Sequence, residues 1–253
     1  MSMFEIVFSP TGGTEKVSGL VTGALDGNIV TVDLTDSGLD FHGVSMAKGD
    51  VAVISVPSYA GRVPAVAVER LGMVRGNGAR AVLVCVYGGR AFEDTLIELE
   101  DVAKRAGFRV VAAVSAIAEH SVARQFAAGR PDAQDVAQLS EFAQRIRQKL
   151  LDGAASEPSI PGNRPYKQAG GHSMVPHATE DCVSCGACAA LCPVRAIDKD
   201  DPRQVDGEAC ISCMRCVSVC PQNARKLDPN KLAAVTQMLS KACVERRECE
   251  IFI

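Results

Sequence analysis

The first 150 residues alternate short apolar runs with segments whose apolar side chains recur every three or four positions. Short unbroken runs are the pattern of buried strands, and the spaced segments are the pattern of helices with one buried face. We predict strands at 3–8, 29–34, 51–56, 81–86 and 109–115. We predict helices after a cap at Thr14, from Pro64, over 92–103 and over 136–150, whereas 38–48 fits either a short helix or a loop.

Nearly continuous Val, Ile and Ala strands that alternate with helices indicate an α/β fold, a five-stranded parallel sheet covered on both faces. Ligands of such sheets bind beyond the carboxyl ends of the strands. Loops leave those ends at 9–14, 57–63 and 87–94. We therefore expect the first functional site of the chain to lie on these three loops.

The first of these loops has the composition of an anion pocket. It reads Ser-Pro-Thr-Gly-Gly-Thr from Ser9 to Thr14, so hydroxyls and glycines surround the free N–H groups of a helix start. That arrangement suits a phosphate monoester. The spacing of a nucleoside-triphosphate loop is absent, and the G-x-G-x-x-A run at 76–81 precedes a strand instead of following one, so it predicts no nicotinamide site.

This loop resembles the FMN-phosphate loop of flavodoxins, and the resemblance extends over residues 1–151. The other interpretation is a polar turn that only caps a helix. The resemblance implies that the next two loops enclose the flavin ring, with Tyr59 as the candidate for stacking and the glycines after Tyr87 close to the ring edge. The FMN contacts implied in this way are Ser9, Thr11, Gly12, Gly13, Thr14, Ser58, Tyr59, Ala60, Gly61, Tyr87, Gly88, Gly89 and Arg90.

Three further polar side chains near these loops have two interpretations each. Arg62 and Arg90 stand where flavodoxins commonly carry acidic residues. They are either solvated charges or cations that raise the potential of a nearby flavin. His120 is either a packed side chain or a proton donor to a substrate or to the flavin.

Eight of the 11 cysteines form an internal repeat. Each half has the order C-x2-C-x2-C-x3-C-P, and the halves differ by 28 residues, as 210 minus 182 and 220 minus 192 both show. Zinc sites and disulfides do not follow this pattern. In the iron–sulfur pattern the cysteine before proline ligates the neighbouring cube. The two sets are then Cys182, Cys185, Cys188 with Cys220, and Cys210, Cys213, Cys216 with Cys192.

This repeat resembles the bacterial two-[4Fe–4S] ferredoxin, a smaller α+β domain, which we expect at residues 177–228. Residues 152–176 are rich in Gly, Pro and Ser and indicate a linker, either loose or packed on a domain. Residues 229–253 predict a helix that buries Leu232, Val235, Leu239 and Ala242, followed by a tail that adds an edge strand or frays. We expect Cys85 in the core, and Cys243 and Cys249 either unligated or as a redox pair.

The composition of the 253 residues narrows the classes of function. A net charge of −3 without a basic stripe argues against nucleic acid as a partner. No apolar run is long enough for a membrane span, and the N-terminus has no signal-peptide pattern, so we expect a cytoplasmic protein.

The chain as a whole resembles fusions of a flavodoxin-type domain with a ferredoxin, often labelled EFR1-type ferredoxins. The resemblance implies two [4Fe–4S] clusters and FMN, which exchange electrons with each other and with redox proteins such as ferredoxin-coupled oxidoreductases. An alternative is an FMN-dependent reductase of a quinone or other small acceptor, fed by the clusters. A redox-sensing module is a third interpretation, although the sequence shows no effector domain.

Overall fold

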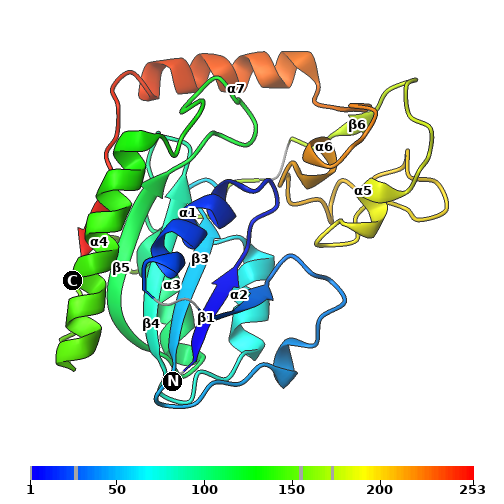
Figure 1. Ribbon diagram of the computed structural model, residues 1–253. Coiled ribbons are helices and arrows are strands. Elements are labelled where there is room, and N and C mark those ends of the chain that lie inside the picture. The colour runs from blue at the N-terminus through cyan, green and yellow to red at the C-terminus, as the bar shows by residue number, and fades with distance from the viewer. Residues whose placement is uncertain (1, 26–27, 154–155, 172–173) are drawn as a thin grey trace.

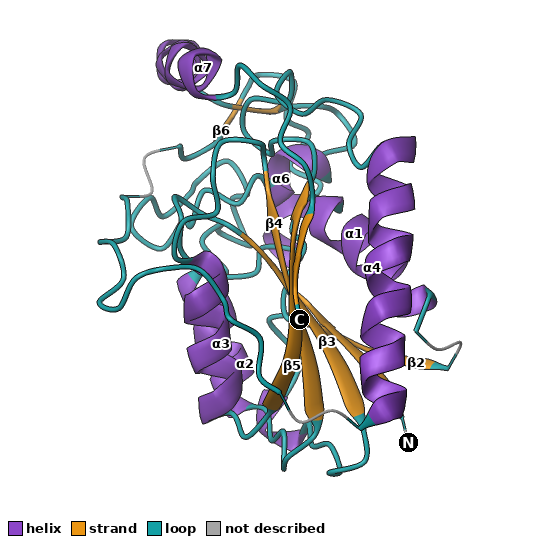
Figure 2. Ribbon diagram, turned by 90° about the vertical axis from the view of Figure 1, so that its left-hand side faces the viewer, coloured by secondary structure: helices purple, strands orange, loops and turns teal. Residues whose placement is uncertain are grey.

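The computed structural model describes residues 2–25, 28–153, 156–171 and 174–253 (Figure 1). The described residues of 2–152, here called the sheet region, form all but one strand of a twisted sheet with helices on both faces. Figure 2 shows α1 and α4 on one face and α2 and α3 on the other. Residues 174–228, here called the cysteine region, stand beside one end of this sheet (Figure 1).

The strands of the sheet lie in the order β2-β1-β3-β4-β5-β8. The first five are parallel to one another, and only β8 runs antiparallel, against β5. The parallel order 2-1-3-4-5 is the flavodoxin-like doubly wound topology, which confirms the predicted fold class. The bounds are β1 (Met3–Val7), β2 (Ile29–Asp33), β3 (Val51–Pro57), β4 (Arg80–Tyr87), β5 (Arg109–Ile117) and β8 (Glu250–Phe252).

The central strands β3 and β4 are buried on both faces because their side chains are almost all Val, Ile, Leu and Ala. Cys85 of β4 is 0% exposed, as expected of a core thiol. The helices that cover the sheet, with one short 3-10 turn, are α1 (Gly13–Gly23), η1 (Phe41–Gly43), α2 (Ala65–Met73), α3 (Thr95–Arg105) and α4 (Ala133–Asp152).

Two predicted helix boundaries were wrong. Thr14 does not cap α1, because the cap position is Gly12 with a φ of 85°, and Ser9 Oγ accepts the N–H of Glu15 at 2.9 Å. Phe92 lies before α3, where its ring packs edge-on against Tyr87 with 5.5 Å between centroids. Helical spacing alone reveals neither the left-handed turn at Gly12 nor the ring contact of Phe92.

The cysteine region is built from very short elements, and its backbone repeats with the same period as its sequence. Left-handed residues recur in pairs 28 positions apart, so the two halves follow one path. These pairs are Ser184 (φ 51°) and Ser212 (φ 53°), Gly186 (φ 75°) and Met214 (φ 64°), and Arg195 (φ 53°) and Asn223 (φ 50°). The elements are β6 (His177–Ala178), α5 (Ala187–Ala190), α6 (Arg215–Ser218) and β7 (Arg225–Lys226).

The segment before the cysteine region packs on the sheet region over its described part. Residues 154–155 and 172–173 of the predicted linker lie outside the described residues. Between them, Asp94 accepts the N–H groups of Asn163 at 2.8 Å and of Lys167 at 2.7 Å, and Arg164 pairs with Asp101 at 2.7 Å. Of the two predicted alternatives, the structure has the packed linker.

The C-terminal segment returns to the sheet region. Helix α7 (Pro229–Ala242) begins at the cysteine region and crosses above the sheet region, and β8 then pairs with β5 (Figure 1). The predicted apolar face of α7 is only partly buried, with Leu239 at 2% exposed, because little chain covers that helix. No helix within the described ranges has the length and apolar character needed to cross a membrane.

Candidate functional site

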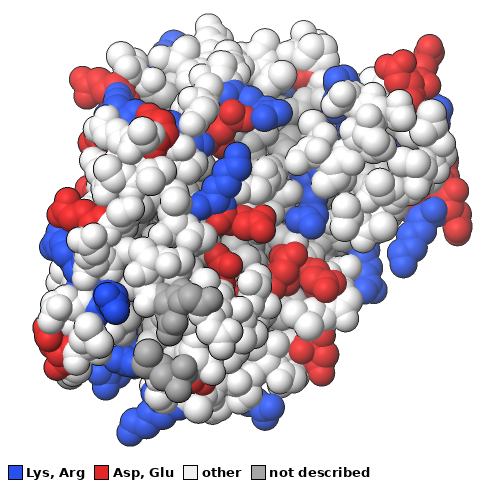
Figure 3. All heavy atoms as spheres, in the orientation of Figure 1, with Lys and Arg blue, Asp and Glu red and all other residues white. Residues whose placement is uncertain are grey.

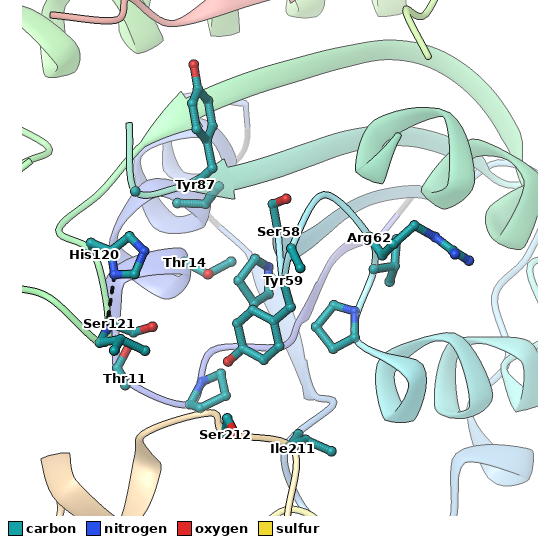
Figure 4. Close-up of a pocket in the computed structure, with 18 of the residues that line it drawn as sticks. Thr11, Thr14, Ser58, Tyr59, Arg62, Tyr87, His120, Ser121, Ile211 and Ser212 are labelled. Atoms are coloured by element: carbon teal, nitrogen blue, oxygen red, sulfur yellow. Dashed lines mark hydrogen bonds between the residues drawn. The ribbon is translucent and has the colours of Figure 1, made fainter. Parts of the chain in front are cut away.

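A cavity of about 440 Å³ lies beyond the carboxyl ends of β1, β3 and β4 (Figure 4). All three predicted loops reach it, and so do the segment after β5, the linker at Ala169 to Gly171 and three residues of the cysteine region, Met174, Ile211 and Ser212. Parallel strands end at the same edge of the sheet, so residues far apart in sequence meet there.

Eight of the thirteen predicted flavin-site residues line this cavity: Thr11, Gly13, Thr14, Ser58, Tyr59, Ala60, Tyr87 and Gly88. The other five, Ser9, Gly12, Gly61, Gly89 and Arg90, do not line it. Ser9 is close by and holds the start of α1, as described above. Arg90 instead pairs with Glu93 at 3.0 Å.

The loop before α1 retains its donors for a ligand. The left-handed Gly12 turns the chain so that the first N–H groups of α1 have no carbonyl of their own helix to bind. Thr11 and Thr14 add hydroxyls on the cavity side (Figure 4). A helix N-terminus of this kind favours an anion.

Tyr59 lies between the cavity and the cysteine region. Its ring points toward Ser212 and Ile211 (Figure 4). Burial raises the pKa of Tyr59 well above its ordinary value, and the neighbouring thiol of Cys213 acts in the same direction. The phenol therefore stays protonated at neutral pH. Ser212 Oγ, in the same contact, is buried without a hydrogen-bond partner among the described atoms.

The other aromatic and cationic residues near the cavity are occupied elsewhere. The Tyr87 ring turns away from the centre of the cavity (Figure 4), and only part of the residue lines it. Arg62 lines the cavity, but its guanidinium pairs with Glu98 at 2.7 Å and donates to the carbonyl oxygen of Lys167 at 2.6 Å. Neither Arg62 nor Arg90 is a free cation at this site.

His120 lines the cavity, and the sequence left open whether it is a packed side chain or a proton donor. Its Nδ1 accepts the N–H groups of Val122 at 3.2 Å and Ala123 at 3.1 Å. Burial, and then the charge of Arg90, lower the pKa of His120, so the ring is neutral at neutral pH. The proton of the neutral ring must then be on Nε2, since Nδ1 is an acceptor. His120 thus brings one N–H donor to the cavity wall.

The eight repeat cysteines surround two further, smaller cavities of about 20 Å³ each. The sets around them are those that the sequence spacing predicts, with the fourth cysteine of each half crossing to the other half. The first cavity is lined by Cys182, Cys185, Cys188 and Cys220. The second is lined by Cys192, Cys210, Cys213 and Cys216. In the described part of the chain no three His, Cys, Asp or Glu side chains converge as a single metal ion requires.

The chemistry of these sulfurs suits cluster ligands. The two crossing cysteines each accept a backbone N–H four residues on, Cys192 from Ala196 at 3.3 Å and Cys220 from Ala224 at 3.2 Å. Burial raises the pKa of Cys213 to about 11 and that of Cys216 to about 12. Thiolates at such positions need a positive group beside them, which cluster iron provides.

The two regions contact each other next to the large cavity. Ile211 lines both that cavity and the second cysteine cavity. Ile211 and Val194 also pack on the core of the sheet region. Arg70 donates to the carbonyl oxygen of Pro193 at 2.6 Å, and Arg195 donates to that of Ser37 at 2.5 Å. Apolar contacts and hydrogen bonds therefore join the second cysteine set to the sheet region.

The remaining cysteines and the surface charge add no further site. Cys243 and Cys249 are both free thiols, and Cys249 is buried with its Sγ 3.8 Å from Asp135 Oδ1. Basic and acidic side chains are interspersed on the face shown in Figure 3, without a basic stripe there.

Comparison with known proteins identifies the cysteine region. Residues 174–221 match the family described as 4Fe-4S dicluster domain. None of the curated proteins compared with the chain matches it.

Similar solved structures align with the sheet region. A flavodoxin of Streptococcus pneumonia TIGR4 is 20% identical, with a TM-score of 0.41, over 58% of this chain and 99% of that chain. Oxidised flavodoxin 1 of Bacillus cereus is 13% identical, with a TM-score of 0.42, over 58% of this chain and 98% of that chain. The flavodiiron core of Flv1 from Synechocystis is 14% identical, with a TM-score of 0.43, over 61% of this chain and 37% of that chain.

The strand order and the family match together define the class, an iron–sulfur electron-transfer protein with a flavodoxin-like domain. The chain is a fusion in which the flavodoxin-like fold precedes the 4Fe-4S dicluster domain.

Proposed function

We propose that this protein carries electrons between two [4Fe–4S] clusters and one FMN, and on to redox partners. The contact between the large cavity and the second cysteine set supports this proposal most strongly. Because Ile211 belongs to both walls, a flavin and a cluster in these places would be neighbours.

The cysteine sets support two clusters rather than one. Four thiols surround each small cavity, and the backbone of both halves takes the same left-handed turns. The first cluster would be held by Cys182, Cys185, Cys188 and Cys220, and the second by Cys192, Cys210, Cys213 and Cys216. Their N–H to sulfur hydrogen bonds stabilise the anionic sulfurs.

The large cavity fits FMN in size and in its polar groups. Its volume is in the range of cofactor sites, and its walls are mostly apolar with a few polar groups. Thr11, Gly13 and Thr14 would hold the phosphate, and Tyr59 would contact the ring. Bound FMN would supply a centre that takes up one or two electrons, whereas each cluster takes up one.

The positions of the two cysteine sets support different roles for the two clusters. The second set is next to the cavity, and the first is farther out, where Cys185 and Val183 are exposed. External donors or acceptors would therefore meet the first cluster, and the second would be the partner of the flavin. The hydrogen bonds of Arg70 and Arg195 hold the second cysteine set against the sheet region.

One observation favours a second candidate, a reductase of a quinone or other small acceptor. His120 brings an N–H donor to the cavity, and Ser121 and Glu119 beside it line the same wall. A bound acceptor could be oriented by these polar groups. Anaerobic turnover with a panel of acceptors tests this: saturable reduction above that of free FMN supports a reductase, and its absence leaves the carrier.

The main test is the content of iron, sulfide and flavin after anaerobic purification with FMN supplied. We expect about eight irons and one FMN per chain, from two four-iron clusters and one flavin site. Reduction by dithionite should then bleach the cluster and flavin absorption together. Iron without flavin would contradict the FMN half of the proposal, and about four irons would contradict the second cluster.

A further inference from the structure

Each of the two cysteine cavities is lined by one arginine whose N–H group has no partner. Arg225 lines the first cavity and Arg215 lines the second. Arg225 Nη1 and Arg215 Nε are buried, and neither has a hydrogen-bond partner among the described atoms. A buried charged donor without a partner is costly, so each points to a ligand in its cavity.

The burial of Arg225 is nearly complete. Its side chain is 2% exposed, and within the described part of the chain it forms no ion pair with a carboxylate. Its Nη2 donates to the carbonyl oxygen of Pro202 and lies 3.5 Å from Cys188 Sγ. A neutral carbonyl does not balance a guanidinium in a low-dielectric interior. The missing negative charge must be beside it, on the cysteine side.

Arg215 is placed between the second cysteine cavity and the sheet region. Its Nη1 is 3.4 Å from the carbonyl oxygen of Ser9, which is a long hydrogen bond to a neutral group. Its Nε has no such partner. Of the groups that this arginine faces, the second cysteine set is the one that becomes anionic when loaded.

The two arginines are not equivalent positions of the 28-residue repeat. The counterpart of Arg225 is Ile197 (225 minus 28), which lines the second cavity, and the counterpart of Arg215 is Ala187 (215 minus 28), which lines the first. At these two pairs of repeat positions, each cavity therefore has an apolar residue from one half and an arginine from the other. Each cavity thus has one positive charge, although the two arginines come from different positions of the repeat.

We propose that Arg225 and Arg215 are positioning residues that each donate one N–H to the cluster in their cavity and balance its charge. The inference depends on the proposed function. Four thiolates outweigh the positive iron–sulfide core, so the loaded site is anionic, and one added electron makes it more so. A fixed cation therefore favours the reduced form and raises the reduction potential of its cluster.

The test is a redox titration of the anaerobically purified full chain, followed by electron paramagnetic resonance. We expect Arg225→Met to lower one of the two cluster potentials by about 59 mV, which is a tenfold change in a one-electron equilibrium. Arg215→Met should lower the other potential. Methionine fills much of the volume without the charge.

Two controls separate charge from shape. Lys226→Met removes the same charge from the neighbouring, exposed position of β7, where solvent screens it, so both potentials should stay within experimental error. Arg225→Lys keeps the charge and should restore most of the potential. Unchanged potentials in both arginine variants, or an equal shift in Lys226→Met, would overturn the inference.

If Arg225→Met does not incorporate its cluster, its potential cannot be measured, and the iron content of the variants is compared instead. If Arg225→Lys contains the full iron content, the positive charge at this position is what the cluster requires. If both variants lack that iron, the role of Arg225 is its hydrogen bond to the Pro202 carbonyl, and the inference is overturned. A wild-type chain without two reducible four-iron centres would instead defeat the proposed function, before any variant is compared.

Discussion

The sheet region and the cysteine region differ in what holds them together. The sheet region buries two large apolar clusters, one on each face of its sheet. The cysteine region has one small cluster, of Cys188, Ala189, Cys192, Ala196 and Ile197, and two of these are proposed ligands. Its helices have four residues and its strands two.

This difference indicates that the cysteine region, and not the sheet region, depends on its cofactors for folding. A region with so little apolar burial cannot offset the entropy of ordering its backbone without metal or cross-links. The sheet region has no such need, because its core forms without the flavin. Cluster loss should therefore unfold one half and leave the other, whereas flavin loss should unfold neither.

The largest expected effect comes from Cys213→Ser, which removes a proposed ligand of the second cluster. Iron should fall from about eight to about four per chain. Backbone amides of residues 205–224 should exchange rapidly with deuterium, whereas those of β3 and β4 should stay protected. Iron analysis and hydrogen exchange measured by mass spectrometry give both results.

The matched control is Cys243→Ser, a cysteine outside the repeat. It should retain all its iron and the wild-type exchange pattern. Equal loss of iron from this control, or early exchange throughout β3 and β4, would show that the two regions do not differ as the burial of their side chains indicates.

A smaller effect is expected from Asp94→Ala, which removes hydrogen bonds that hold the linker on the sheet region. Asp94 is 1% exposed and accepts two backbone N–H groups of the linker, from Asn163 and Lys167. Loss of these charge-assisted hydrogen bonds should cost the docked linker about 3 kcal/mol. Limited proteolysis should then cut within 156–171 before either region, and Asp36→Ala, on an exposed loop, should leave the wild-type pattern.

The same contact predicts a pH dependence. Burial acts to raise the pKa of Asp94, but the N–H groups of Lys167 and Asn163 outweigh it, so the pKa is lowered from 3.8. The stabilisation is thus complete above the ordinary carboxyl pKa and is lost only as the pH falls through the lower folded-state value. Proteolysis of the wild-type linker at pH 5 and pH 7 should be the same, and a release near pH 6 would refute this role of Asp94.

The sequence predicted what depends on local periodicity. The five parallel strands followed from runs such as 51–56 and 81–86, and both cysteine sets followed from the spacing of the repeat. The return of the tail as β8 was one of two open alternatives, because an isolated four-residue end has no partner in its own sequence.

Residues that depend on long-range contacts were predicted less well. The face of α7 that was expected to be buried is only partly covered, with Leu239 at 2% exposed and Leu232 and Val235 half-buried. The closure of the cavity by Ile211 and Ser212 was not predicted, since no period in the sequence reports that one region docks on another. Those contacts follow from the shapes of two surfaces and from the arginines that join them.

The smallest expected effect tests whether the wall after β5 belongs to the flavin site. A Cβ on Gly88 would lie 2.5 Å from His120 Cδ2 and 2.7 Å from His120 Cβ, so Gly88→Ala must displace the histidine from the cavity wall. The sheet core is not involved, and the fold should therefore persist. We expect the dissociation constant for FMN to rise about tenfold, which is about 1.4 kcal/mol, as measured by quenching of flavin fluorescence on titration with the flavin-free chain.

Gly19→Ala is the control, because no atom lies within 4 Å of its added Cβ on the exposed side of α1. It should leave FMN affinity unchanged and stabilise the helix by about 0.5–1 kcal/mol. Equal FMN affinity in Gly88→Ala and wild type would place the flavin away from His120, and would confine its contacts to the loops after β1 and β3 and to the cysteine region.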